Sequence, residues 1–473
     1  MSFRARLARF LEGPGGGREV LEISTPLMLT QVSYTLQVFV DRLFLTWYST
    51  DAMAGAVTGY FSTIALIGLF SSVGEYATAF VAQYLGAGRR ERIGPAVWQG
   101  IYFALASGLL VAALAPLAGT LFTAAGHPPA LRESEVAFAR VLMHGAFFTI
   151  LSATLASFFA GRGKTRVVLL VNVAALAVNV VLDWLLIFGH GGFPRWGVTG
   201  AARATVAAQA AACALFLALM LRRRHRDRYA TSTGWRFEAP LFWRMLRFGI
   251  PSGLQLFAEV FAFSLFLVIV GRIGTDALAA SGIAFNLNMI VFMPMLGLSM
   301  GVSSLVGRYV GMGRTDVAER VTFTAFRMSL VFMAACGALY VFAPRLLLAP
   351  YATGADPARF GAIAASTTVL LRYIAFYSIF DMMNVVFAGG LKGAGDTRYP
   401  FLLTLTLAVF ALLVPSWLLC VKLGYGLYAA WSVATLYVAL LGPLMMRRFL
   451  ARGWKHLSLI ERHAPEKPAA VSL

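Results

Sequence analysis

The segment from Pro26 to Arg89 recurs as Pro251 to Arg314, aligned without a gap at a constant offset of 225 residues (251 − 26). The first copy ends in Gln83-Tyr84-Leu85-Gly86-Ala87-Gly88-Arg89, and the second ends in Arg308-Tyr309-Val310-Gly311-Met312-Gly313-Arg314. Earlier in each copy, Thr50-Asp51-Ala52-Met53-Ala54 matches Thr275-Asp276-Ala277-Leu278-Ala279. The chain is therefore a duplicated structure whose two halves are expected to share one fold.

The composition indicates an integral membrane protein. Of the 473 residues, 59% are hydrophobic and 13% are charged, which is more apolar surface than a soluble domain buries. Apolar runs of roughly 20 residues suit transmembrane helices. About twelve such runs occur, starting near residues 22, 53, 95, 136, 167 and 197 and near 249, 278, 318, 365, 399 and 425. The runs lack the ten-residue alternation of a membrane β-barrel, so we expect an all-α membrane fold with twelve transmembrane helices.

The longest polar connection, about Arg222 to Phe242, separates six spans from six. We therefore predict an N-lobe of residues 1–228 and a C-lobe of residues 229–473. A second match supports the division, because Gly161-Arg162-Gly163-Lys164-Thr165-Arg166 resembles Gly393-Ala394-Gly395-Asp396-Thr397-Arg398. Since six is an even number, the two lobes share one orientation and form a parallel internal repeat about an axis along the membrane normal. Such repeats enclose a cleft between the lobes.

The net charge of +19 follows membrane topology rather than nucleic-acid binding. With the N-terminus inside, about 29 of the 40 lysines and arginines fall in the termini and inner loops, and about six in the outer loops. The positive-inside rule then places both termini in the cytoplasm, as expected for a multi-pass protein of the inner membrane. The basic cluster Arg222–Arg228 is expected to lie beside anionic lipid. Cys213, Cys336 and Cys420 have no metal-site spacing, and no phosphate-binding loop of the P-loop pattern occurs.

Two acids of the first half lie within predicted spans at similar depth. Asp41 precedes the outer end of the first helix by about seven residues, and Asp183 precedes that of the fifth by about six. Asn172, Asn179 and Asp183 are spaced by seven and four, so they share one helical face. A carboxylate in the bilayer must be paired, protonated or bound to a cation. Asp41 and this face are therefore expected to form a Na⁺ site or a pair of carboxylates that holds a proton.

The second half repeats this arrangement on other helices. Glu259 lies about ten residues from the inner end of the seventh helix, and Asp381 about nine from that of the tenth. Tyr377 shares the helical face of Asp381, four residues away. The positions matching Asp41 and Glu259 are Phe266 and Tyr34, so the two lobes are expected to have separate ionisable centres.

Structural roles are the alternative for these acids. Arginines inside or near span ends could form ion pairs with them, namely Arg42, Arg140, Arg203, Arg327 and Arg372. Glu75 lies in the inner half of the second helix without an assignable partner. Flexible thioethers and aromatic rings near the expected cleft could bind varied or cationic molecules, or simply pack helices; the candidates are Phe285, Met289, Met293 and Met382.

Several motifs together resemble the multidrug and toxic compound extrusion (MATE) transporters, including their NorM-like and DinF-like members. The resemblance covers nearly the whole chain. It is carried by Pro26 with Val40-Asp41, by Val81 to Arg89, by Asn179-Val180-Val181-Leu182-Asp183, by Gly249-Ile250-Pro251 followed by Glu259, and by Asp381 followed by Gly389-Gly390-Leu391-Lys392-Gly393.

The resemblance implies export of organic, often cationic, drug-like molecules in exchange for Na⁺ or H⁺ by alternating access between two six-helix lobes. Asp41, Asn179 and Asp183, with Thr205 as a fourth member, match the N-lobe cation site of that family. Glu259, Tyr377 and Asp381 match the C-lobe site of its NorM-like branch. Glu75 departs from the family pattern, in which a small or neutral polar residue is usual.

The sequence thus predicts a monomeric antiporter with small organic molecules and membrane lipid as partners, no nucleic acid, no cofactor and no enzymatic activity. Na⁺ or H⁺ is the expected coupling ion. A related alternative is a flippase for a lipid-linked oligosaccharide, which would need a larger and more cationic cleft. An intramembrane enzyme is disfavoured, because the acid pairs lie in separate lobes without a nucleophile or metal set.

Overall fold

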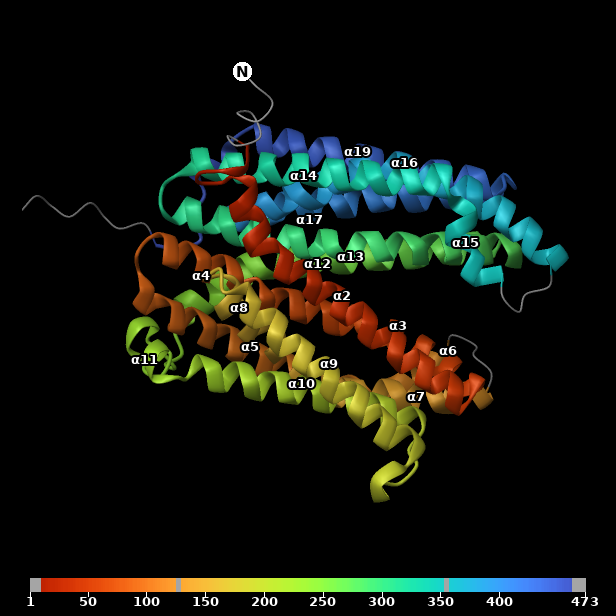
Figure 1. The fold of residues 1–473 in the computed structure, drawn as a ribbon, viewed down its shortest axis with the longest axis horizontal. Coiled ribbons are helices and arrows are strands. Elements are labelled where there is room, and N and C mark those ends of the chain that lie inside the picture. The colour runs from red at the N-terminus through yellow and green to blue at the C-terminus, as the bar shows by residue number, and fades with distance from the viewer. Residues whose placement is uncertain (1–9, 125–128, 353–356, 462–473) are drawn as a thin grey trace, which may run out of the picture.

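The computed structural model describes residues 10–124, 129–352 and 357–461, and within these ranges the chain is helical and contains no β-strand (Figure 1). Ten helices are long and apolar enough to cross a membrane, and a helix pair bent by 46° forms an eleventh candidate. The more polar helix α2 (Gly17–Tyr48), with 32 residues, is also long enough to span. The all-α membrane fold predicted from the sequence is confirmed.

The first six long segments form one side of the molecule, coloured red to yellow-green in Figure 1. After α2 they are α3 (Thr50–Glu75) continued by α4 (Ala77–Gly86), α5 (Ile93–Leu114), α7 (Pro129–His144) bent into α8 (Ala146–Ala160), α9 (Thr165–Phe188) and α10 (Val198–Met220). The short helix α6 (Ala118–Ala124) precedes α7, and α11 (Arg223–Tyr229) follows α10. The exact lobe boundary at residues 228 and 229 stays a prediction.

The other six long segments, coloured green to blue in Figure 1, form the second lobe. They are α12 (Ala239–Gly271), α13 (Thr275–Gly311), α14 (Thr315–Phe342), α16 (Pro357–Ala394), the segment that joins α17 (Arg398–Leu407) through π-helical turns to α18 (Val414–Trp417), and α19 (Leu427–Leu450). The short α15 (Pro344–Ala352) links α14 to the following connection.

The lobes pack through a contact that occurs twice. Helix α2 lies against α13, and α12 lies against α3. Because the 225-residue offset carries α2 onto α12 and α3 with α4 onto α13, these are the same contact repeated about the axis that relates the halves. The first helix of each lobe is therefore packed on the second helix of the other.

Two repeat-related glycines lie where the lobes meet at the end that carries the terminal segments. A Cβ on Gly86 would lie 2.0 Å from the backbone oxygen of Arg308, and one on Gly311 would lie 2.2 Å from that of Gln83. Nearby, the Gln83 amide nitrogen donates to the backbone oxygen of Gly393 at 3.0 Å. Backbone meets backbone at these points, so the lobes are closed together at this end.

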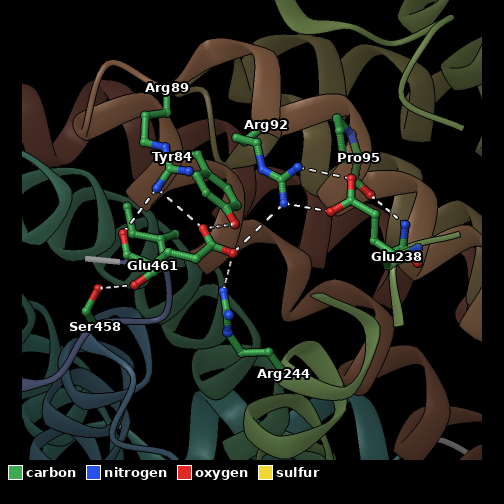
Figure 2. Close-up of polar contacts among 10 residues, drawn as sticks. Tyr84, Arg89, Arg92, Pro95, Glu238, Arg244, Ser458 and Glu461 are labelled. Carbon is green, nitrogen blue, oxygen red and sulfur yellow. Dashed lines mark hydrogen bonds and ion pairs between the residues drawn. The ribbon is translucent and has the colours of Figure 1, made fainter. Parts of the chain in front are cut away.

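The segment after α19 crosses from the C-lobe to the N-lobe at the same end (Figure 2). Leu459 is fully buried, and its N–H donates to Oε1 of Gln83 at 3.0 Å. Glu461 accepts from the Tyr84 hydroxyl at 3.1 Å and forms an ion pair with Arg89 at 3.4 Å. Arg244, near the start of α12, also forms an ion pair with Glu461. Residues 453–461 therefore tie the two lobes together, and we call them the C-terminal tether.

Glu461→Gln should weaken this tether without unfolding the protein. Burial raises the pKa of the Glu461 carboxyl, but the hydrogen bonds and charge of Arg244 and the Tyr84 hydroxyl together outweigh burial, so the pKa lies below its ordinary value. The ionised form therefore stabilises the tether above the ordinary carboxyl pKa of about 4.3, and this stabilisation is lost as the pH falls through the lowered folded-state pKa. We expect the variant to lower the Tm by about 1–3 °C.

This Tm difference between wild type and variant should stay constant between about pH 6 and pH 8, where Glu461 is ionised in both the folded and the unfolded protein. Thermal unfolding of wild type and variant across this range measures it. Asp316→Asn, which removes an exposed carboxylate that pairs with Arg314 at 3.7 Å, is the control with little expected effect. A difference that grows or vanishes between these pH values would contradict the assignment.

Candidate cation sites and the inter-lobe cavity

Three helices bring the four predicted N-lobe site residues together. Asp41 lies on α2, Asn179 and Asp183 on α9, and Thr205 on α10. The Thr205 hydroxyl donates to Oδ2 of Asp41 at 3.5 Å, and Asp41 also interacts with the side chains of Asn179 and Asp183. Asn179 and Asp183 are fully buried. Asp41 and Asp183, which the sequence places at similar depth in the membrane, therefore lie beside each other in the structure.

This N-lobe cluster contains more oxygen atoms than donors. Oδ1 of Asp41, both carboxylate oxygens of Asp183 and both amide atoms of Asn179 are buried and have no hydrogen-bond partner among the described residues. Unpartnered buried polar atoms are costly. Two adjacent carboxylates also cannot both ionise in the bilayer without compensation. The residues fit a shared proton or a monovalent cation such as Na⁺, which would take the carboxylate and amide oxygens as ligands.

Transition-metal binding has no support in the part of the chain that the structure describes, where no group of three or more His, Cys, Asp or Glu side chains could hold a metal ion. The oxygen donors at the N-lobe cluster are instead of the type that hard cations prefer.

Tyr34 belongs to the polar face beside this cluster, although the sequence analysis treated it only as the counterpart of Glu259. Its hydroxyl donates to Oδ1 of Asn172 at 2.8 Å. The Asn172 amide nitrogen donates to the Val168 backbone oxygen at 2.8 Å. Asn172 is thus satisfied by hydrogen bonds, whereas Asn179, two turns further along α9, is not. The part of the α9 face with unsatisfied polar atoms therefore begins at Asn179.

The predicted C-lobe residues also converge, with partners that the sequence analysis did not identify. Oε1 of Glu259 accepts from the Gln255 amide at 3.0 Å, and Asn384 also interacts with this carboxylate. Asp381 interacts electrostatically with Glu259, and Tyr377 with Asp381. Tyr437, whose buried hydroxyl has no partner in the described residues, interacts with both acids.

Helical spacing could have identified two of these additional residues. Gln255 precedes Glu259 by four positions, and Asn384 follows Asp381 by three, so each shares a face with its acid. Lys392 follows Asp381 on α16 by eleven positions (392 − 381), about three helical turns, so it also shares the face of that acid. It interacts electrostatically with both Glu259 and Glu75. Tyr437 lies on α19, and no spacing rule connects it to the acids.

The four more distant arginines do not pair with the buried acids. Among the described residues, no ion pair joins Asp41, Asp183, Glu259 or Asp381 to any of the more distant arginines considered, and these are exposed: Arg140, Arg203, Arg327 and Arg372. Arg203 instead stacks on Trp196, with its guanidinium carbon 4.0 Å from the ring centroid. Arg42 is next to Asp41 in sequence and attracts its charge electrostatically.

The predicted substrate-cleft set does not come together. Met382 is 1% exposed and packs inside the C-lobe core, and it does not line the inter-lobe cavity described next; its assignment to a substrate cleft stays a prediction. Phe285 stacks on Trp431 with ring centroids 5.0 Å apart, also within the C-lobe. Met289 is 41% exposed, and neither it nor Met293 lines the inter-lobe cavity described next.

A cavity of about 180 Å³ lies between the lobes instead. Its walls come from α2, α3, α4 and α8 of the N-lobe and from α12, α13 and α16 of the C-lobe. Glu75 and Lys392 both line it. The sequence suggested no partner for Glu75. In the structure it lines the same cavity as Lys392, a basic residue of the other lobe.

Both lobes of this structure match the model of a known protein family. The MatE family model matches residues 26–185 and 251–417, one stretch in each lobe, and together these cover more than half of the chain. The chain belongs to the MatE family of transporters.

Curated relatives of this MatE protein are similar along most of their length. The probable multidrug resistance protein NorM of Geobacillus kaustophilus is 30% identical over 404 residues, covering 82% of this chain and 84% of that protein. The protein of the same name from Thermotoga maritima is 26% identical over 458 residues, covering 95% and 96%. Membership of the family predicted by resemblance is confirmed.

Solved structures share the fold of this MatE protein. An outward-facing multidrug resistance MATE family transporter superposes with a TM-score of 0.83 at 20% identity, covering 94% of this chain and 98% of that one. A MOP superfamily transporter from Pyrococcus furiosus, described as having a binding pocket of reverse polarity, also gives a TM-score of 0.83 at 20% identity, covering 94% and 97%. The chain is therefore a multi-pass membrane transporter of two six-helix lobes.

Proposed function

We propose that this MatE protein is a secondary antiporter that exports organic, often cationic, drug-like compounds in exchange for Na⁺ or H⁺. The observation that carries the proposal is the N-lobe cluster, in which buried oxygens of Asp41, Asn179 and Asp183 lack hydrogen-bond partners. Binding a proton or Na⁺ there removes the cost of buried uncompensated charge. The names of the curated relatives, which are multidrug resistance proteins, support the substrate class.

Alternating access would couple the two processes. Asp41 lies on α2, which packs both on α9 of its own lobe and on α13 of the other. Loss or gain of charge at Asp41 changes how α2 fits against α9, and this bias reaches the inter-lobe contact through the same helix. Both termini would lie in the cytoplasm at the end where the C-terminal tether joins the lobes. The C-lobe cluster around Glu259 and Asp381 would be a second ion-sensitive centre.

Two alternatives fit the observed cavity less well. A flippase for a lipid-linked oligosaccharide needs several basic side chains to bind phosphates, whereas this cavity has Lys392 as its one lysine or arginine among the described lining residues. For an intramembrane metalloenzyme, a metal site beside the acids would be needed, and no group of three or more His, Cys, Asp or Glu side chains in the described residues could hold one.

Transport in liposomes tests the proposal. Purified protein is reconstituted with ethidium as a fluorescent cation, and pH and Na⁺ gradients are imposed separately. We expect a gradient of one of these ions to drive ethidium movement that stops when the gradient is collapsed by an ionophore. Ion-coupled export would be rejected if ethidium moved at the same rate with and without the gradients, or if it did not move under either gradient.

A further inference from the structure

The inter-lobe cavity lies on the axis of the internal repeat. Gln31 and Leu256 both line it and are related by the offset of 225 residues, and so are Thr78 and Ser303. Each lobe thus contributes the same structural positions to opposite walls. A cavity built in this way is continuous only while the lobes are together, because each half of its lining moves with a different lobe.

Charge breaks the symmetry of this cavity. Glu75 projects from the N-lobe wall, and its repeat counterpart on the C-lobe wall is Met300. Lys392 projects from the C-lobe wall, and the glycine-motif match that follows it makes Ala160 its N-lobe counterpart. One acid and one base therefore occupy positions whose partners in the repeat are uncharged.

The two charged residues line the same cavity without forming an ion pair. Lys392 and Glu75 are half-buried and interact electrostatically, but no hydrogen bond or ion pair involves the Glu75 carboxylate or the Lys392 ammonium in the described part of the chain. Opposite charges in a bilayer normally pair directly. A separated pair that lines a cavity is instead open to a molecule placed between them.

A neighbouring hydroxyl adds a further polar group. The Thr78 hydroxyl, 8% exposed, lines the cavity and has no hydrogen-bond partner among the described residues.

We propose that the inter-lobe cavity binds a small zwitterionic molecule, with its ammonium group at Glu75 and its carboxylate group at Lys392. This inference rests on the proposed transport function and adds to the drug-like cargo a smaller, zwitterionic ligand of the cavity between the lobes. Charge-assisted hydrogen bonds of this kind are the strong ones in proteins. At about 180 Å³, the cavity is smaller than the roughly 300–1,000 Å³ of sites for drug-sized ligands, so the ligand is of amino-acid size.

Binding would also join the lobes. The ligand bridges Glu75 of the N-lobe and Lys392 of the C-lobe, beside the contact in which the Tyr76 hydroxyl donates to the Lys392 backbone oxygen at 2.8 Å. The zwitterion therefore favours the state in which this end is closed, and separation of the lobes here divides its site. Lys392 also interacts with Glu259, so a bound carboxylate changes the charge balance of the C-lobe cluster.

Three ligands that share a phenyl ring test the charge pattern by equilibrium binding to purified protein. They are phenylalanine, with both charges; phenethylamine, with the ammonium alone; and 3-phenylpropionate, with the carboxylate alone. Radiolabelled phenylalanine is measured directly, and the other two compete with it. Wild type should bind phenylalanine most tightly. Lys392→Gln should weaken phenylalanine and 3-phenylpropionate by about 10- to 100-fold but leave phenethylamine unchanged, and Glu75→Gln should give the converse pattern.

Met300→Gln is the matched control, because it places the same amide on the opposite wall without removing a charge. It should not discriminate among the ligands by charge. Equal weakening of all three ligands by Lys392→Gln and Glu75→Gln, unchanged binding in both, or no phenylalanine binding by wild type would overturn the zwitterion site. Binding is measured without gradients, so this result is separate from ethidium export, whose failure would instead reject the antiport function.

Discussion

Asp41→Asn is expected to reduce ion-driven ethidium efflux to the leak of protein-free liposomes while the protein still inserts and folds. The substitution keeps the shape of the side chain and its hydrogen bond with Thr205, which is 3.5 Å from Oδ2. It removes the charge that would change when a proton or Na⁺ binds beside Asp183. Without that change, the ion has no differential affinity for the two states, and a ligand that binds both states equally shifts nothing.

Initial efflux rates under an imposed pH or Na⁺ gradient measure this effect. Glu22→Gln is the matched control, because Glu22 is an exposed acid on the same helix and its loss should leave the rate unchanged. A thermal unfolding profile close to wild type separates lost coupling from lost folding. Full ion-driven efflux by Asp41→Asn would exclude Asp41 from coupling. Complete loss of ion-driven efflux in Asp41→Asn, together with normal efflux by Glu259→Gln, would place coupling in the N-lobe.

Much of the candidate site could be predicted because helices convert spacing into position. Asp41 and Asp183 were placed together by counting residues to the ends of two helices that run in the same direction. Asn179 followed from its spacing of four to Asp183. These predictions use only distances along a helix and the cost of charge in hydrocarbon, and both are properties of the chain itself.

The inter-lobe cavity could not be predicted in the same way. Lys392 and Glu75 are 317 positions apart (392 − 75), and their approach depends on how the two lobes pack across the repeat axis. For the same reason, the burial of Met382 in the C-lobe core could not be predicted from the sequence, because packing decides which residues of α16 lie inside that core. Spacing within one helix says nothing about the rotation of that helix against its neighbours.

One pair of glycines related by the repeat has a role that only the structure reveals. Gly86 and Gly311 occupy matching positions, and sequence alone allows them to be ordinary helix-ending residues. The structure separates two kinds of glycine here. Gly88 and Gly313 have φ values of +76° and +74° and make the turns, whereas Gly86 and Gly311 let the backbones of the two lobes touch.

Gly311→Val should therefore trap the transporter with its lobes apart at this end. The added Cβ would lie 2.2 Å from the backbone oxygen of Gln83, and a backbone atom within a packed helix cannot move aside as a side-chain tip can. Overpacking of this kind typically costs about 1–3 kcal/mol, and here only the closed state bears the cost. The ratio of closed to open molecules should fall by about 5- to 150-fold, and ethidium transport should fall with it.

Spin labels at Ala87→Cys and Met312→Cys, two exposed positions related by the repeat, report this separation when the natural cysteines are replaced. Gly311→Val should lengthen the distance between the labels, and Gly86→Val should do the same, because its Cβ would meet the Arg308 backbone oxygen at 2.0 Å. Gly68→Val is the matched control, since nothing lies within 4 Å of a Cβ there. An unchanged label distance in both variants would mean that the lobes tolerate the added volume without opening. Lengthening in both would show that close backbone contact between the repeats sets the balance between the two states.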